Sequence, residues 1–186
     1  SDIAFDATID SAFKVVTINP SSDFSSQQAV YVAIGATVEN SCDEAISADN
    51  ATFTVVDANV PTLTSSSPSD GATGIGVNAN LVLTFSEAVD KESGNITIKK
   101  SSDDSTVETF DVTGAGGSGS TEITINPSTT LDGSTGYYIT IDASAFDDSS
   151  GNSYAGISDA TTLNFTTADI AAPTLTFSPA NSASGI

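Results

Sequence analysis

Two stretches of this sequence repeat each other at a fixed distance, and that repeat constrains the fold more than any other feature. VTINPSSDFSSQQAVYVAIG, residues 16–35, returns as ITINPSTTLDGSTGYYITID, residues 123–142, at an offset of 107 residues (123 − 16). Where the two differ, apolar residues mostly replace apolar ones, as in Phe24 against Leu131 and Val32 against Ile139. A sequence that recurs in this way is expected to build the same supersecondary structure twice.

A second repeated pair gives the length of the unit. VPTLTSSSPSDGATGI returns as APTLTFSPANSASGI, which places Pro61 and Pro173 112 residues apart (173 − 61). We therefore interpret residues 1–58 as the C-terminal half of one unit, residues 59–169 as a complete unit and residues 170–186 as the first strand of a following unit. A chain of 186 residues is long enough for one domain of ordinary size and part of another.

Apolar and polar residues alternate with period two, and no segment sustains the 3.6-residue period of a helix. In GYYITID, Tyr137, Ile139 and Ile141 share one face of a strand, and NANLVLTFSEAV alternates in the same way. Clusters of Gly, Asn, Asp, Pro and Ser bound these runs, which is typical of an all-β sandwich. Within the complete unit we expect seven strands, at about residues 61–66, 79–86, 94–100, 106–112, 121–126, 136–142 and 161–167. This predicts an all-β, immunoglobulin-like β-sandwich in tandem repeats.

The order of these motifs resembles a known family. PTLTSSSPSDGATGIGVNANLVLTFSEAV is followed by GNITI, INPSTTLDGSTGYYITID, DDSSGNSYAG and LNFTT, and this order is similar to the bacterial Ig-like domain first noted in S-layer proteins. Residues 61–167 match throughout. Residues 14–58 match the last third loosely, because ENSCDEAISADN stands where the family has a D-x-x-G-N loop. The resemblance implies tandem arrays in long secreted or surface-anchored proteins, an extracellular or cell-surface location, and no catalytic activity.

The charge balance excludes several kinds of partner. The chain has 24 acidic residues, four lysines and a net charge of −20. Such a surface repels nucleic acid phosphates and anionic lipid headgroups, so we expect no nucleic acid partner and no membrane insertion. The longest apolar run, residues 29–36, is far shorter than the roughly 20 residues needed to span a bilayer. Cys42 is the single cysteine, so an intrachain disulfide is excluded. Histidine is absent, which deprives a serine or cysteine nucleophile of its usual base, and we expect no enzyme.

An Asp-rich loop is the first candidate calcium site. FDDSSGNSYAGISD follows a predicted strand that ends at Asp142. Asp148, Ser150 and Asn152 have the alternate spacing of oxygen ligands that wrap a calcium ion, although no glutamate follows at the distance found in an EF-hand. The alternative is a solvated turn in which Asp and Asn bind their own backbone. The candidate metal ligands are Asp142, Asp147, Asp148, Ser150 and Asn152, together with Asp169 from the second site.

The second candidate calcium site lies where units join. VVDANVPTL and TTADIAAPTL place Asp57 and Asp169 four residues before the proline that begins the next unit. A cation held there by Asp169 and by loop carboxylates of adjoining units would stiffen an otherwise hinged array. The alternative is a linker whose aspartate only keeps it soluble.

Three functions follow from these features. The first is a structural spacer or stalk of a repetitive bacterial surface protein or adhesin, with neighbouring Ig-like repeats as its partners. The second is an assembling subunit of an S-layer or extracellular filament, since strand addition across subunits can complete an open sheet. A simple swap does not close the sandwich, however, because residues 173–186 supply one strand whereas residues 1–58 lack about three. The third is a module that binds a cell-surface glycan or a protein receptor, for which Tyr31 and Tyr138 are the candidate exposed stacking residues.

Overall fold

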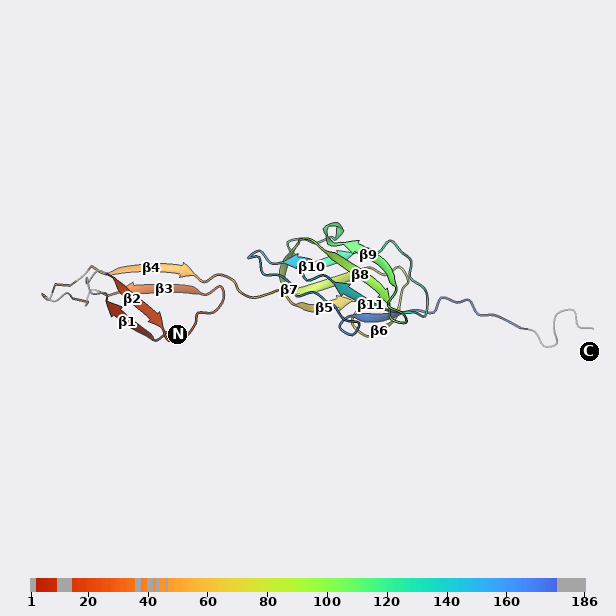
Figure 1. Ribbon diagram of the computed structural model, residues 1–186, viewed down its shortest axis with the longest axis horizontal. Coiled ribbons are helices and arrows are strands. Elements are labelled where there is room, and N and C mark those ends of the chain that lie inside the picture. The colour runs from red at the N-terminus through yellow and green to blue at the C-terminus, as the bar shows by residue number, and fades with distance from the viewer. Residues whose placement is uncertain are drawn as a thin grey trace, which may run out of the picture. The chain divides into compact units, whose positions relative to one another are not determined.

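The structure, a computed structural model, describes residues 3–9, 15–35, 38–39, 42, 44–45 and 47–176. The chain divides into two compact units, Ser1–Asn59 and Val60–Ile186. β-Strands make up the regular structure of both units, and the described residues contain no α-helix (Figure 1). The prediction of an all-β, immunoglobulin-like sandwich is therefore confirmed.

Nine strands build the C-terminal unit: β5 (Leu63–Ser67), β6 (Ala72–Ile75), β7 (Leu81–Lys91), β8 (Asn95–Lys100), β9 (Thr106–Asp111), β10 (Ser120–Ile125), β11 (Gly136–Ile141), β12 (Phe146–Asp147) and β13 (Asn164–Thr167). One sheet has the order β6–β13–β11–β8–β9, and in the other β7 pairs with β10, β5 and β12. All pairs are antiparallel except β6 with β13. A short 3-10 turn, Val112–Gly114, follows β9.

The alternation read from the sequence places the core of this unit. Tyr137, Ile139 and Ile141 of β11 are 0%, 1% and 3% exposed, so they form the inward face, as predicted. Leu83 of β7 is also fully buried. The Phe85 ring packs against Phe146 and Tyr154, with ring centroids 5.2 Å apart in both pairs. Burial raises the pKa of the Tyr154 hydroxyl, because the phenolate loses its hydration there.

Three details of the strand prediction are wrong. β7 extends to Lys91, five residues beyond its predicted end, because it bends at an irregularity in its pairing with β10 and then pairs with β12. β6 and β12 were not expected, since four and two residues are too short to show a period. Pro61 was placed at the head of a strand, but it precedes β5 and its side chain is fully buried.

The described part of the N-terminal unit consists of two hairpins: β1 (Phe5–Ile9) pairs with β2 (Val16–Pro20), and β3 (Ala29–Ile34) pairs with β4 (Asp49–Thr54). The β3–β4 hairpin has the register of its repeat partner. Val30 lies opposite Phe53 in β3–β4, and their repeat counterparts Tyr137 and Phe165 lie opposite each other in β11–β13.

The turn before β3 is also equivalent to the turn before β11. Gln27 and Ser134, which the repeat aligns, both have left-handed backbones, with φ of 56° and 52°. Few residues other than glycine adopt that conformation. Its recurrence at aligned positions therefore means that the repeated sequence folds in the same way locally in both units.

The two copies differ in burial. Phe53 is 47% exposed, whereas its counterpart Phe165 is 6% exposed. The described part of the N-terminal unit has only two-stranded sheets, while β11 is flanked by both β8 and β13. Equivalent side chains are therefore buried in the C-terminal unit and about half exposed in the described part of the N-terminal unit.

The expected first strand of a third unit, residues 170–186, is only partly described. Residues 170–176 form no strand, and residues 177–186 lie outside the described residues. No described helix is long and apolar enough to cross a membrane.

Candidate functional site

The Asp-rich loop is positioned by the core beneath it. Phe146 of β12 is fully buried, which fixes the backbone where the loop begins. Asp148 follows and is 6% exposed, one of two buried polar residues among those described. A carboxylate taken out of water must be stabilised by nearby donors or by a cation.

The loop itself supplies those donors. One Asp148 carboxylate oxygen accepts hydrogen bonds from the N–H groups of Ser150 and Asn152, both at 2.8 Å. The other accepts one from the Asn152 amide nitrogen, also at 2.8 Å. Gly151 provides the left-handed backbone of the turn, with φ of 84°. The structure thus brings together three predicted ligands, Asp148, Ser150 and Asn152, as an aspartate-anchored turn in which Ser150 and Asn152 donate hydrogen bonds.

The other predicted ligands lie apart from this turn. One Asp142 oxygen accepts from the Asn95 backbone N–H at 2.8 Å, which ties the end of β11 to the start of β8. Asp147 lies opposite Asp90 in the β12–β7 pair, and one of its carboxylate oxygens is buried with no hydrogen-bond partner among the described residues. Like charges opposite each other across two strands are destabilising.

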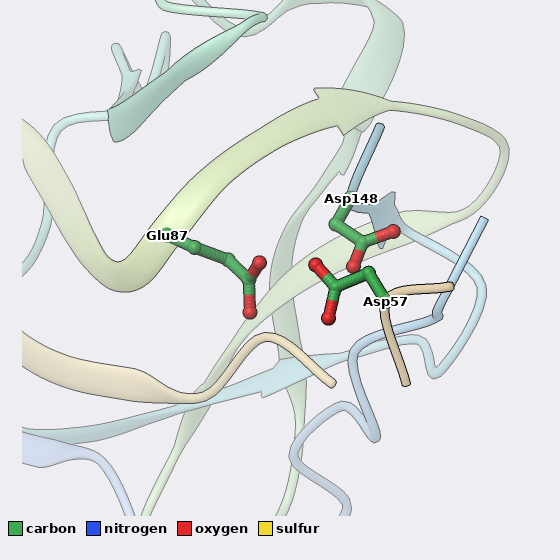
Figure 2. A group of neighbouring side chains, drawn as sticks. All are labelled: Asp57, Glu87 and Asp148. Atoms are coloured by element: carbon green, nitrogen blue, oxygen red, sulfur yellow. The ribbon is translucent and has the colours of Figure 1, made fainter. Parts of the chain in front are cut away.

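A carboxylate that the sequence analysis missed lies beside Asp148. Figure 2 shows Glu87 of β7 directed toward Asp148, and one carboxylate oxygen of each lies within 4.8 Å of the other. Two negative charges brought this close together repel each other. Glu87 continues the apolar alternation of Leu83, Phe85 and Val89. A charged residue at an inward-facing position of a strand was therefore the sequence feature that could have identified Glu87 as a site residue. Asp57, also drawn in Figure 2, belongs to the N-terminal unit.

The two joint aspartates make equivalent local contacts. Asp57 accepts a hydrogen bond from the Asn59 N–H at 3.0 Å, and Asp169 accepts one from the Ala171 N–H at 2.8 Å. Asp57 also accepts from the hydroxyl of Ser26 at 2.6 Å and from the side-chain amide of Gln27. These bonds, that from Ser26 foremost, hold the pKa of the Asp57 carboxyl below its usual value. Each aspartate therefore fixes the backbone of the two residues that follow it.

The tyrosines proposed for sugar stacking differ from each other. Tyr31 is 64% exposed, but Tyr138 is only 6% exposed and donates a hydrogen bond from its hydroxyl to Asp104 at 3.0 Å. The expectation that Tyr138 is exposed is therefore wrong. The loop between β8 and β9, which carries Asp104, provides its partner. Burial, and next the Asp104 carboxylate, raises the pKa of this hydroxyl.

A shallow depression on the C-terminal unit is the remaining candidate. Its volume is about 240 Å³, and most of the residues that line it are polar, including the ion pair between Lys100 and Asp132 at 2.8 Å. Small-molecule sites usually enclose roughly 300–1,000 Å³ with mostly apolar walls. The depression is too small and too polar to be such a site.

Comparison with known proteins identifies the fold family. A family described as a bacterial Ig-like domain matches residues 57–167. Among solved structures, the crystal structure of CopC from Methylosinus trichosporium OB3b is similar at 19% identity and a TM-score of 0.43, over 61% of this chain and 99% of that one. That likeness is too low to carry an argument about function. No curated protein matches the sequence.

Proposed function

Because this chain belongs to the bacterial Ig-like domain family through residues 57–167, we propose that it is a spacer or stalk unit of a repetitive bacterial surface protein or adhesin. Domains of this family are typically extracellular structural modules and are generally non-catalytic. The observation that carries the proposal is the common register of two antiparallel strand pairs, Val30 opposite Phe53 and Tyr137 opposite Phe165. A strand pair that recurs in the same register along one chain is consistent with an array of like modules.

The proposal is tested by lengthening the chain. A second copy of residues 60–171, inserted after Ala171, should add one folded domain to the array. By small-angle X-ray scattering, the maximum dimension should grow by roughly 35 Å, the diameter expected for about 110 compact residues. An insertion of equal length made of Gly and Ser is the control, because it adds chain without adding a domain. An unchanged maximum dimension would refute the spacer role.

We further propose that calcium stiffens the C-terminal unit through Glu87 and Asp148. The support is the repulsion between two carboxylates whose oxygens lie within 4.8 Å, one of them on a buried residue. A divalent cation with oxygen ligands would relieve it. The local hydrogen bonds of Asp148 to Ser150 and Asn152 leave the loop intact without the ion, so calcium would add rigidity to a folded unit.

The calcium proposal is tested by thermal unfolding in millimolar CaCl2, compared with NaCl of equal ionic strength and with chelator. Calcium should raise the midpoint beyond the NaCl value, and Glu87→Gln should remove that increment. Glu92→Gln is the matched control, because Glu92 is an exposed acid just after the same strand. Equal midpoints in CaCl2 and NaCl would contradict calcium binding.

An assembling subunit of an S-layer or filament is the second candidate, favoured by large apolar side chains that are exposed among the described residues of the N-terminal unit. Phe5 is 58% exposed and Phe53 is 47% exposed, and large exposed apolar side chains can take part in an interaction surface. Light scattering across a range of concentrations tests this. A monomer at every concentration rules out self-assembly.

A further inference from the structure

Strands β6 and β13 of the C-terminal unit lie side by side at one edge of the five-stranded sheet and run in parallel. β6 lies near the beginning of the unit, after β5, and β13 is the last strand described in it. Figure 1 shows the chain entering this sandwich at one end and continuing from the opposite end. A pull applied through the chain on both sides therefore acts on β6 from its N-terminal end and on β13 from its C-terminal end.

The parallel direction decides how such a pull loads the bonds between the two strands. Ala72 lies opposite Phe165, and Ile75 lies opposite Thr167. The pulled ends, at Ala72 and Thr167, are therefore at opposite ends of the pair. The strands are driven to slide along each other, so the bonds between them resist together. If both strands were pulled from the same end, the bonds would open one after another, and each opening would need less force.

Hydrogen bonds close both ends of this pair. The N–H of Gly71 donates to the carbonyl oxygen of Asn164, and the N–H of Ala168 donates to the carbonyl oxygen of Ile75, both at 2.8 Å. One carboxylate oxygen of Asp70 accepts from the backbone N–H of Asn164 at 3.0 Å and from its side-chain amide at 2.7 Å. Hydrogen bonds to an ionised acceptor are roughly twice as strong as neutral ones. Asp70 therefore adds a strong side-chain link to the main-chain bonds.

The two strands differ in how they are attached to the rest of the unit. β13 also pairs with β11, from Gly136 opposite Thr166 to Tyr138 opposite Asn164. Thr167 is 3% exposed, and its hydroxyl donates a hydrogen bond to the carbonyl oxygen of Asp132 at 2.6 Å. Among the described residues, β6 pairs with β13 alone. β13 is therefore the strand through which the sheet holds β6.

We propose that the β6–β13 pair bears the load when the C-terminal unit is pulled along the chain. β5 meets the pull first, but its pairing with β7 is irregular between Leu63 and Ser65, so β5 detaches and passes the load to β6. The unit then stays folded until the bonds between β6 and β13 break together. This inference rests on the spacer role, because a unit within an array is the one that is pulled from both sides.

The first experiment pulls the full chain at constant force in two directions. One geometry has its handles at the two chain termini. In the other, the C-terminal handle is moved to Ala160, an exposed residue before β13, so that β6 and β13 are pulled from the same end. Unfolding of the C-terminal unit is recognised by a gain in length of roughly 300 Å, expected for about 100 released residues.

At equal force, the unit should unfold roughly tenfold faster or more with the handle at Ala160, the change produced by a barrier lower by about 1.4 kcal/mol. Equal rates in the two geometries would overturn the proposal. This comparison needs no substitution within β6 or β13, so it does not depend on a variant that folds. The rate of unfolding governs rupture under force.

A second measurement compares two aspartates with matched hydrogen bonds. Asp70→Ala removes both bonds to Asn164. Asp103→Ala is the control, because one oxygen of Asp103 accepts from the N–H and the hydroxyl of Ser105 at 3.1 and 2.6 Å, away from the loaded strands. With handles at the termini, Asp70→Ala should speed unfolding under load by roughly tenfold, and Asp103→Ala should leave the rate nearly unchanged.

Equal acceleration in the two variants, or acceleration in neither, would overturn the load-bearing role of the β6–β13 pair. Urea unfolding without force is the reference, and there both variants should lower the midpoint because each loses two hydrogen bonds. The spacer role fails by a different result, since it is refuted when the lengthened chain keeps its maximum dimension in scattering. The two outcomes are therefore distinguishable.

Discussion

At the scale of single residues, many aspartates in this chain organise their own backbone. Asp103, Asp111 and Asp159 each accept hydrogen bonds from both the N–H and the hydroxyl of the Ser or Thr two residues later, at 2.6–3.1 Å. These bonds hold the pKa of all three carboxyl groups below the usual value. The short Asp side chain reaches these donors, as Asn does in the same kind of turn. Part of the acidic composition therefore serves to form turns.

Asp159 should make stability depend on pH. Its carboxylate accepts from both the N–H and the hydroxyl of Thr161 and of Thr162, and its pKa is held far below the unfolded value. A group of this kind contributes stability above its unfolded pKa, near 3.9, and the contribution is lost as pH falls toward the folded pKa. We expect Asp159→Ala to flatten the decline of the melting temperature between pH 5 and pH 2, followed by circular dichroism. Glu122→Gln, at an exposed site, should leave that profile unchanged.

Gly156 should tolerate no side chain. Its φ is +78°, and an added Cβ would lie 2.8 Å from the Ala143 nitrogen and nearer still to the Ile141 carbonyl oxygen. Because both are backbone atoms, the steric clash can be relieved only if the backbone moves. We expect Gly156→Ala to lower the free energy of unfolding by about 2–5 kcal/mol. Gly71→Ala, at φ +69° in open space, should cost only about 1 kcal/mol, and equal losses in the two variants would contradict this account.

At the scale of elements, the alternation of apolar and polar residues predicted the strands correctly only where a strand was long enough to show that alternation. Six residues of β11 displayed their inward face plainly, and the hairpin repeat predicted its equivalent in β3. β6 and β12 exist because a neighbouring strand offers them an edge, β13 in one case and β7 in the other. Strands this short show no alternation in the sequence from which they could be predicted. The burial of Tyr138 was missed for the same reason, since its cover comes from a loop outside its own strand.

The two copies of the hairpin should respond differently to the same truncation. Ile139 is 1% exposed, and its counterpart Val32 is only partly buried. We expect Ile139→Ala to destabilise the C-terminal unit by about 2–5 kcal/mol. Val32→Ala should destabilise the N-terminal unit by less than about 1 kcal/mol, because a half-open site leaves little cavity. Urea titration followed by NMR signals from each unit measures both, and a loss at Val32 equal to that at Ile139 would show that β3 is covered in solution.

At the scale of the molecule, the fold was more predictable than the candidate site. Sandwich architecture follows from alternation and turns spread along the whole chain, so single errors do not change it. The site depends on single distances. Alternate spacing picked out Asp148, Ser150 and Asn152 because they are neighbours in sequence, but Glu87 reaches Asp148 only through the packing of β7. Asp142, with an equally plausible place in the sequence, is instead bound to Asn95.

The net charge of −20 should make the folded chain sensitive to ionic strength as a whole. Folding brings the acidic residues closer together, and their repulsion is screened over about 30 Å at 0.01 M salt and about 3 Å at 1 M. We expect the melting temperature to rise with NaCl across that range. A variant carrying Asp6→Asn, Asp23→Asn, Glu92→Gln and Glu122→Gln, all at exposed positions, should start from a higher midpoint in low salt and gain less from added salt. If wild type and variant gain equally, the salt is acting on apolar surface instead of on charge, and the acidic surface would not limit the stability of this chain.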